Sequence, residues 1–252
     1  ATSGENYVIL GTHQKLYVLN GSNYYDITPI RATTTNGITF AATNGSSTIT
    51  ATDSDHGAVT GDFVTISGAV SLGGLVTAAV LNQEYQIDAV TGDNTYTITA
   101  KDTTGATVTA NSSDSGNGGS GVDGAYQINS GLDVYVRSTG WGINTWGAGA
   151  WGAEADLSLT NQLRLWSIDN FGDDTIAAPR GGALYFWDKS DGLTTRAVAL
   201  SAETGASDVP TVCLQVMTSD VDKHVIAFGS NPIGSSSIDP LLVRFSDRES
   251  AV

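Results

Sequence analysis

The chain has 252 residues, with 11 Lys and Arg against 26 Asp and Glu, which gives a formal net charge of −15 at pH 7. A protein that wraps nucleic acid needs clustered Lys and Arg to bind phosphates, so this balance argues against such a partner. It still allows a surface past which DNA slides, and solubility is the simpler explanation of the charge. A hydrophobic content of 40% argues against a disordered chain, and 30 Gly among many Thr and Ser favour strands joined by tight turns.

Cysteine content and hydropathy restrict the chemistry further. Cys213 is alone, so neither an intramolecular disulfide nor a Cys-based metal site can form, and its apolar surroundings, TVCLQVM, predict a small buried residue. No apolar stretch approaches the length of a membrane span, and no secretory signal is visible. The chain begins at Ala1 without Met and stops just after a strand-like run, so we expect a fragment of a longer polypeptide.

The first predicted element is a pair of strands over residues 7–21, YVILGTHQKLYVLNG, followed by a third strand, YYDITPI. The same order returns at 174–190, DTIAAPRGGALYFWDKS, and more loosely at 224–247. In each copy the later strand begins with a Leu, an apolar residue follows three positions on, and a small polar residue comes next: Leu16, Leu19 and Asn20; Leu184, Trp187 and Asp188; Leu242, Phe245 and Ser246.

Residues 36–121 differ in composition from the rest of the chain, with alternating Thr and few aromatic residues. Segments such as STITATD, DFVTISG and NTYTITAKD predict four or five short strands with Gly-Asp turns. VTAAVLNQEYQ (76–86) is the one segment with some helical character, and the following YQIDAV favours a strand instead. The block ends in ANSSDSGNGGSGVDG, which we interpret as a flexible run. We predict a small β-barrel or β-sandwich, inserted into a loop and folding independently.

Residues 140–153, GWGINTWGAGAWGA, place three Trp-Gly pairs five residues apart. An odd spacing puts successive rings on opposite faces of a strand, and on a helix they would lie roughly 140° apart. The segment is therefore predicted to be a loop whose three Trp rings must pack against other groups. Packing within the chain, sugar stacking and a subunit interface are the three alternatives, and the candidate contact residues are Trp141, Trp146 and Trp151.

Further strands complete the later repeats. QLRLWSI and TVCLQVM are candidate opening strands, and TTRAVAL follows the second copy. Four-stranded meanders repeated along a chain are typical of β-propeller blades, although an ordinary sandwich is the alternative. The fold class predicted is thus all-β, a partial β-propeller with an inserted domain. Its parts are residues 1–35 (first blade), 36–121 (insertion) and 122–252 (further blades). Three partial blades cannot close a ring of about four to eight, which again indicates missing chain.

Motifs that would carry chemistry are weak. GNGGSG (116–121) matches a dinucleotide pattern in letters, but a strand-like AYQI follows it where a helix is required. DSDHG (53–57) and NSSDSGN (111–117) fail the calcium-loop pattern. The three His residues are scattered, and acidic residues near one another in turns do not identify a glycosidase pair: Asp169, Asp173, Asp174 and Asp188. We therefore assign no catalytic, cofactor-binding or metal-ligating residue and expect no enzyme and no cofactor.

Several segments resemble a family of phage structural proteins. They include LYVLNGSNYYDITPIR, the Trp-Gly run, LRLWSIDNFGDDTIAAPRGGALYFWD and DKHVIAFGSNPIGSSSIDPLLVRFSDRES. Over residues 7–35 and 122–250 the chain is similar to the tail nozzle, or tail tubular protein B, type of short-tailed bacteriophages. The resemblance weakens across the inserted block.

The resemblance implies a virion protein without catalytic residues. Such a subunit assembles as a ring, usually a hexamer, below an adaptor ring and beside other tail proteins. Double-stranded DNA leaves the capsid through its centre without specific binding. The further blades that the family should have are absent from this sequence. The alternative is a receptor- or glycan-binding β-rich tail fibre or spike protein that uses the Trp loop and the inserted domain as its contact surface.

Overall fold

The computed structural model describes residues 6–132 and 163–251, which are almost entirely β-strands and turns. The chain divides into two compact units. One comprises Ile30–Ser130 and is called here the sandwich unit; the other combines Ala1–Pro29 with Gly131–Val252 and is called the stacked-sheet unit. The prediction of an all-β protein is confirmed.

The sandwich unit contains two antiparallel sheets. One has the strand order β11-β5-β6-β10-β9, and the other β4-β12-β7-β8. The elements are β4 (Ile30–Thr34), β5 (Thr39–Ala42), β6 (Thr48–Thr52), β7 (Phe63–Ser67), the one-turn helix α1 (Ala78–Leu81), β8 (Glu84–Gln86), β9 (Ala89–Gly92), β10 (Thr95–Thr99), β11 (Asp114–Asn117) and β12 (Asp123–Gln127).

Strict alternation of small polar and apolar residues explains these sheets. In β6, TITAT, the residues Ile49 and Ala51 are buried while the Thr residues at both ends are exposed. A strand with period two can bury only one face, so two such sheets must pack face to face. Their shared core takes Phe40 and Tyr96 from one sheet and Val64 and Tyr126 from the other. The insertion is therefore a sandwich, since neither sheet closes into a barrel.

Two local predictions in this unit were wrong. At 76–86 the chain first forms α1, capped by Thr77, and only then enters β8. The Ser/Gly run is not a linker, because β11 lies within it and pairs with β5. Its glycines allow a close approach: Gly118 has a φ of +97°, and a Cβ there would lie 2.6 Å from the Phe40 ring. A short apolar run does not distinguish helix from strand, and composition alone does not distinguish a linker from an edge strand.

The ends of the sandwich unit are set by strand pairing. β4 and β12 pair along their length, from Gly124 opposite Thr34 to Gln127 opposite Ile30, and β12 also pairs with β7. Both strands therefore belong to the second sheet. Both β4 and β12 lie outside the block 36–121. The strand β7, with which β12 pairs, lies inside it.

We expect residues 30–130 expressed alone to fold, because they contain both sheets and the whole shared core. A two-dimensional NMR spectrum should show the dispersed amide proton shifts of a β-protein. The shorter block 36–121 is the matched control, since it lacks β4 and the central strand β12 and should unfold. A random-coil spectrum for residues 30–130 would contradict the prediction.

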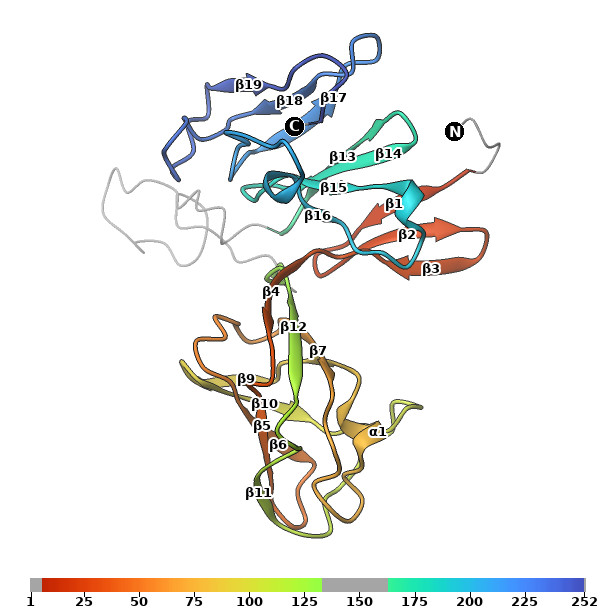
Figure 1. Ribbon diagram of the computed structural model, residues 1–252, viewed down its shortest axis with the longest axis vertical. Coiled ribbons are helices and arrows are strands. Elements are labelled where there is room, and N and C mark those ends of the chain that lie inside the picture. Colours follow the sequence, from red (N-terminus) through yellow and green to blue (C-terminus); the bar gives the residue numbers. More distant parts are fainter. Residues whose placement is uncertain (1–5, 133–162, 252) are drawn as a thin grey trace, which may run out of the picture. The chain divides into compact units, whose positions relative to one another are not determined.

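The stacked-sheet unit contains three antiparallel sheets, each a meander in chain order (Figure 1). The first sheet is β1 (Val8–Gly11), β2 (Leu16–Asn20) and β3 (Asn23–Asp26). The second is β13 (Trp166–Phe171), β14 (Asp174–Pro179), β15 (Tyr185–Trp187) and β16 (Val198–Ala199). The third is β17 (Gln215–Thr218), β18 (Val225–Phe228) and β19 (Val243–Phe245). Short 3-10 helices, η2 (Lys189–Asp191) and η3 (Leu200–Ala202), flank β16.

The second sheet is covered on both faces. Toward the first sheet it contributes Ala177 and Trp187 to a core with Leu16 and Val18. Toward the third sheet it contributes Ile176 and Ala178 to a core with Val216 and Ala227, among others. Burial on both faces explains why β14 is buried at nearly every position, as expected for neighbouring blades of a propeller.

In the third sequence repeat, the strand that matches the Leu-led strands of the other two turns the opposite set of side chains toward the core. Leu16 and Leu184 are both buried toward the following sheet. Phe245, predicted to match buried Trp187, is instead 75% exposed, whereas its neighbour Arg244 lies opposite buried Ala227. A shift of one residue turns every side chain of a strand to the other face, so letter matching assigned the correct strand but the wrong face.

Candidate functional site

The predicted contact residues Trp141, Trp146 and Trp151 lie in residues 133–162, outside the described part of the chain. The choice between sugar stacking, a subunit contact and internal packing for this loop stays a prediction. The candidate sites that follow lie within residues 6–132 and 163–251.

The four carboxylates considered from the sequence fall into two places. Asp169 accepts a hydrogen bond from the Thr218 amide at 2.7 Å and so binds β13 to the third sheet. Asp173, Asp174 and Asp188 gather around Lys189 at the end of the β13–β14 hairpin. There Asp174 accepts the Lys189 amide hydrogen at 3.1 Å, and Asp188 caps η2 through the Ser190 amide at 2.6 Å.

The pKa of Asp174 is raised above its usual value. Burial raises its pKa above the usual value, and the negative charges of Asp188 and Asp173 act in the same direction. The Lys189 amide and the Lys223 ammonium oppose that rise. The group therefore organises a turn and a short helix through main-chain contacts.

Two residues of the DSDHG motif, Asp53 and His56, are buried in the core of the sandwich unit, whereas Ser54, Asp55 and Gly57 are exposed. Asp53 is buried and accepts hydrogen bonds from the Thr34 hydroxyl at 2.8 Å and from the Tyr126 hydroxyl at 2.5 Å. Burial raises the pKa of Tyr96 to about 12, and the charge of Asp53 adds to that rise. His56 packs against both tyrosine rings, and its Nδ1 accepts the Ala58 amide hydrogen at 3.0 Å. Within the described residues no group of three or more potential metal ligands occurs.

Cys213 is fully buried, as the sequence predicted. Burial raises the pKa of its thiol to about 11, so the thiolate is scarce at neutral pH. Its main chain bridges the second and third sheets, with the Cys213 amide donating to Gly182 O at 2.9 Å and Cys213 O accepting from the Gly181 amide at 2.7 Å. The residue is a packing element.

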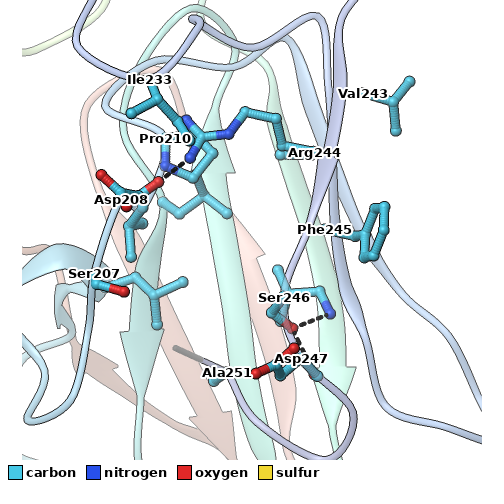
Figure 2. Close-up of a pocket in the computed structure, with 15 residues that line it drawn as sticks. Ser207, Asp208, Pro210, Ile233, Val243, Arg244, Phe245, Ser246, Asp247 and Ala251 are labelled. Atoms are coloured by element: carbon cyan, nitrogen blue, oxygen red, sulfur yellow. Dashed lines mark hydrogen bonds between the residues drawn. The ribbon is translucent and has the colours of Figure 1, made fainter.

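A pocket of about 440 Å³ opens where the second and third sheets diverge (Figure 2). Leu184, just before β15, and Leu200, in η3, line it together with Val225 and Ala227 of β18. On its wall the Arg244 guanidinium donates to two main-chain carbonyls, those of Asn231 and Asp208. No sequence pattern indicates this pocket, because its lining comes from segments that are far apart along the chain.

The polar groups of the pocket serve the main chain. The Ser246 hydroxyl accepts the Val225 amide hydrogen at 3.0 Å and donates to Ser250 O at 2.6 Å. Arg244 and Ser246 therefore hold the loop 207–210 and the C-terminal segment against β18 and β19. This arrangement fixes a shape, because the Ser246 hydroxyl bonds to main-chain groups and the neighbouring His224 Nδ1 bonds to Ser246 O at 2.7 Å.

The outward face of the third sheet is apolar and exposed. Met217, Ile226 and Phe245 lie opposite one another across the three strands, and Gln215, Phe228 and Val243 form the neighbouring row. Figure 2 shows Val243 and Phe245 on the opposite side of β19 from Arg244. Leu241, in the turn before β19, is 91% exposed. Contiguous apolar surface of this kind marks a contact site.

The outward face of the first sheet has the same character. Val8, Leu19 and Tyr24 form one row, and Leu10, Tyr17 and Asp26 form the next. Val8, Leu10 and Tyr24 are exposed, and the rings of Tyr17 and Tyr24 meet edge to face at 6.3 Å. These two outward faces are the candidate functional surfaces of the protein.

Asp26 is the charged member of these rows, and the cationic side chains of Lys15 and Arg196 compensate its charge. Its carboxylate accepts from Lys15 Nζ at 2.9 Å, from Arg196 Nη1 at 3.0 Å and from the Thr28 amide at 2.9 Å. Burial acts to raise its pKa, but the hydrogen bonds from Thr28 and Lys15 and the charge of Arg196 together hold the pKa below its usual value of 3.8. Arg196 follows η2 in the chain, so this cluster also joins the first and second sheets.

We expect Asp26→Asn to lower the free energy of unfolding of the stacked-sheet unit by about 2 kcal/mol at neutral pH. Because the folded pKa lies below the unfolded one, this contribution is present above the unfolded pKa and is lost as pH falls through the folded pKa. Denaturant unfolding of both proteins between neutral pH and about pH 2 measures it. A difference between them that stays constant down to about pH 2 would show that ionisation of Asp26 is not its source.

Comparison with known proteins gives little. No protein-family model matches the chain, and no curated protein matches it. Among solved structures, the Phage phi92 endosialidase aligns with 15% identity and a TM-score of 0.31, covering 90% of this chain and 34% of that one. The chain thus spans about a third of the length of that protein. Likeness at this level assigns neither a fold nor an activity. Within the described residues, none of the helices is long and apolar enough to cross a membrane.

Proposed function

We propose that this protein is a non-enzymatic structural subunit of a bacteriophage tail, part of the nozzle or tubular ring through which DNA leaves the capsid. The observation that carries the proposal is the stack of meander sheets whose first and last members present apolar outward faces. A protein that works alone covers such faces, whereas an assembly subunit keeps them for its neighbours. The resemblance of residues 7–35 and 122–250 to tail nozzle proteins supports the same role.

The charge supports a passive conduit. Residues 30–130 carry nine acidic residues against two basic ones, Arg31 and Lys101. The Arg31 guanidinium is engaged within the unit, donating to His56 O at 3.0 Å and lying over the Tyr126 ring. A surface so poor in free cations does not retain DNA phosphates, and repeated acidic rings would keep the duplex centred. Single carboxylates act only within about 8 Å at physiological salt, so ring symmetry is needed for this effect.

Electron microscopy of the assembled protein tests the proposal. We expect a ring, six-fold in the simplest case, that surrounds a channel lined by neutral and acidic residues and contacts an adaptor ring in the virion. A channel lined mainly by Lys and Arg, or the absence of a central opening, would overturn it. Gel shift with double-stranded DNA should show no retention at physiological salt.

A glycan array separates this role from receptor binding. The conduit role predicts no specific hit. A specific hit that Trp146→Ala abolishes would replace the proposal with a receptor- or glycan-binding tail fibre or spike. Turnover of a host envelope polysaccharide would replace it with an enzyme.

A further inference from the structure

The two outward faces of the stacked-sheet unit differ in which neighbour they could receive: one corresponds to the side of a preceding sheet and the other to the side of a following sheet. The second sheet is covered on one face by the first sheet and on the other by the third. Each sheet thus has a face that receives the preceding sheet and a face that receives the following one. Within residues 6–132 and 163–251, no sheet covers the preceding-side face of the first sheet or the following-side face of the third.

The repeat in the sequence supports this equivalence for the first sheet. LYVL (16–19) corresponds to LYFW (184–187), so Leu19 corresponds to Trp187. Trp187 is 2% exposed because the first sheet packs over it. Leu19 lies in the row Val8–Leu19–Tyr24, on the outward face. The first sheet therefore exposes the same face that the second sheet uses to receive a neighbour.

We propose that the outward face of the third sheet in one copy binds the outward face of the first sheet in a second copy, head to tail. This contact continues the order of sheets within the unit, in which a following-side face always meets a preceding-side face. Because the two contacting surfaces differ, the interface is heterologous, and it generates a ring if the rotation closes and a filament if it does not.

The composition of both faces suits such a contact. The two rows on the third sheet contain no charged residue, since Arg244 lies on the opposite side of β19. On the first sheet the charge of Asp26 is compensated by Lys15 and Arg196. Desolvation of either face is therefore inexpensive. Each face also presents an exposed aromatic anchor, Phe245 at 75% and Tyr24 at 62%, of the type enriched at interface centres.

The proposal rests on the stacking of the sheets and does not depend on a role in a phage tail. It also explains the pocket beside β19. The loop 207–210 and Arg244 line the pocket between the second and third sheets, and the bond from Arg244 to Asp208 O holds β19 in place. A supported edge strand presents Val243 and Phe245 as a fixed surface, which lowers the ordering cost of binding.

Single-face variants of the full chain test the interface. We expect the parent protein to self-associate in sedimentation equilibrium, and Phe245→Lys or Tyr24→Lys to weaken that association by at least about tenfold. Val221→Lys is the matched control, because Val221 is apolar and 84% exposed but lies in the turn between β17 and β18, off the face. It should leave association unchanged. Phe245→Ser and Tyr24→Ser replace the Lys variants if these unfold, with circular dichroism as the check.

Mixing the variants gives the decisive measurement. The Phe245 variant keeps the first-sheet face, and the Tyr24 variant keeps the third-sheet face. We therefore expect an equimolar mixture to form a one-to-one pair with about the parent affinity, although each variant alone associates at least about tenfold more weakly. Association that survives Tyr24→Lys but not Phe245→Lys would mean that two third sheets meet, and it would overturn the proposal. A parent protein that stays monomeric would overturn it as well. Association without a central opening would leave the interface standing and remove only the conduit role.

Discussion

Trp187→Ala is expected to lower the free energy of unfolding of the stacked-sheet unit by about 3–5 kcal/mol. The Trp187 side chain is buried between the first and second sheets, where it packs with Leu16 and Val18 and meets Tyr7 edge to face at 6.2 Å. Its indole N–H donates to Thr195 O at 3.1 Å. The substitution therefore leaves a cavity at the joint of two sheets and an unpaired carbonyl oxygen.

Tryptophan fluorescence during denaturant unfolding measures this loss in one unit only. All five Trp residues lie outside residues 30–130, so the signal reports the stacked-sheet unit: Trp141, Trp146, Trp151, Trp166 and Trp187. The amide NMR signals of the sandwich unit should keep their parent midpoint. Val198→Ala on the neighbouring strand β16 is the control, because Val198 is exposed, and it should cost less than about 0.5 kcal/mol. Equal destabilisation by both substitutions would contradict the packing argument.

Asp62→Ala is expected to lower the free energy of unfolding of the sandwich unit by about 3–5 kcal/mol, since hydrogen bonds to a charged group each contribute about 1.5–3 kcal/mol. The Asp62 side chain is completely buried. It accepts from the Ser130 amide at 2.8 Å, the Val59 amide at 2.9 Å and Asn129 Nδ2 at 3.1 Å. These bonds fasten the end of the unit to the turn before β7, and alanine removes the acceptor of all three donors.

Amide hydrogen exchange measures this second effect residue by residue. Protection should fall throughout residues 30–130, while the fluorescence midpoint of the stacked-sheet unit stays unchanged. Asp62→Asn keeps one acceptor oxygen, so its free energy of unfolding should lie between those of the parent protein and of Asp62→Ala. Asp88→Ala is the control, because Asp88 is exposed and accepts one bond from the Thr99 hydroxyl, so we expect at most about 0.5 kcal/mol. A loss for Asp62→Ala no larger than for Asp88→Ala would contradict the role of the buried carboxylate.

The strands themselves could be predicted from local patterns. Alternation in TITAT and TYTIT predicts half-buried strands, and β6 and β10 follow it. The apolar runs at 184–187 and 224–228 predict strands buried on both faces, and β15 and β18 lie there. For β18 the burial was predicted wrongly, because Ile226 and Phe228 lie on the outward face of the third sheet. The meander order within each repeat also follows from the sequence, because short turns leave consecutive strands adjacent.

The candidate surfaces could not be predicted in this way. The sequence drew attention to the Trp-Gly loop, whereas the described structure directs attention to Phe245 and Tyr24. The carboxylates at 169 and 174 are close in sequence, but they lie at different places in the sheet stack. The sequence alone does not show which face of a strand a neighbouring sheet covers.

By itself the sequence determined the all-β class, most strand positions, the meander repeats and the acidic balance, because each follows from side-chain alternation, turn residues and charge over a few neighbouring positions. Only the tertiary structure decided that β11 joins β5, that β4 and β12 belong to the sandwich unit, and that Phe245 faces outward while Trp187 faces inward. Those features depend on pairings between residues far apart in the chain. With a side-chain period of two, a register change of one residue exchanges the buried and exposed faces of a strand.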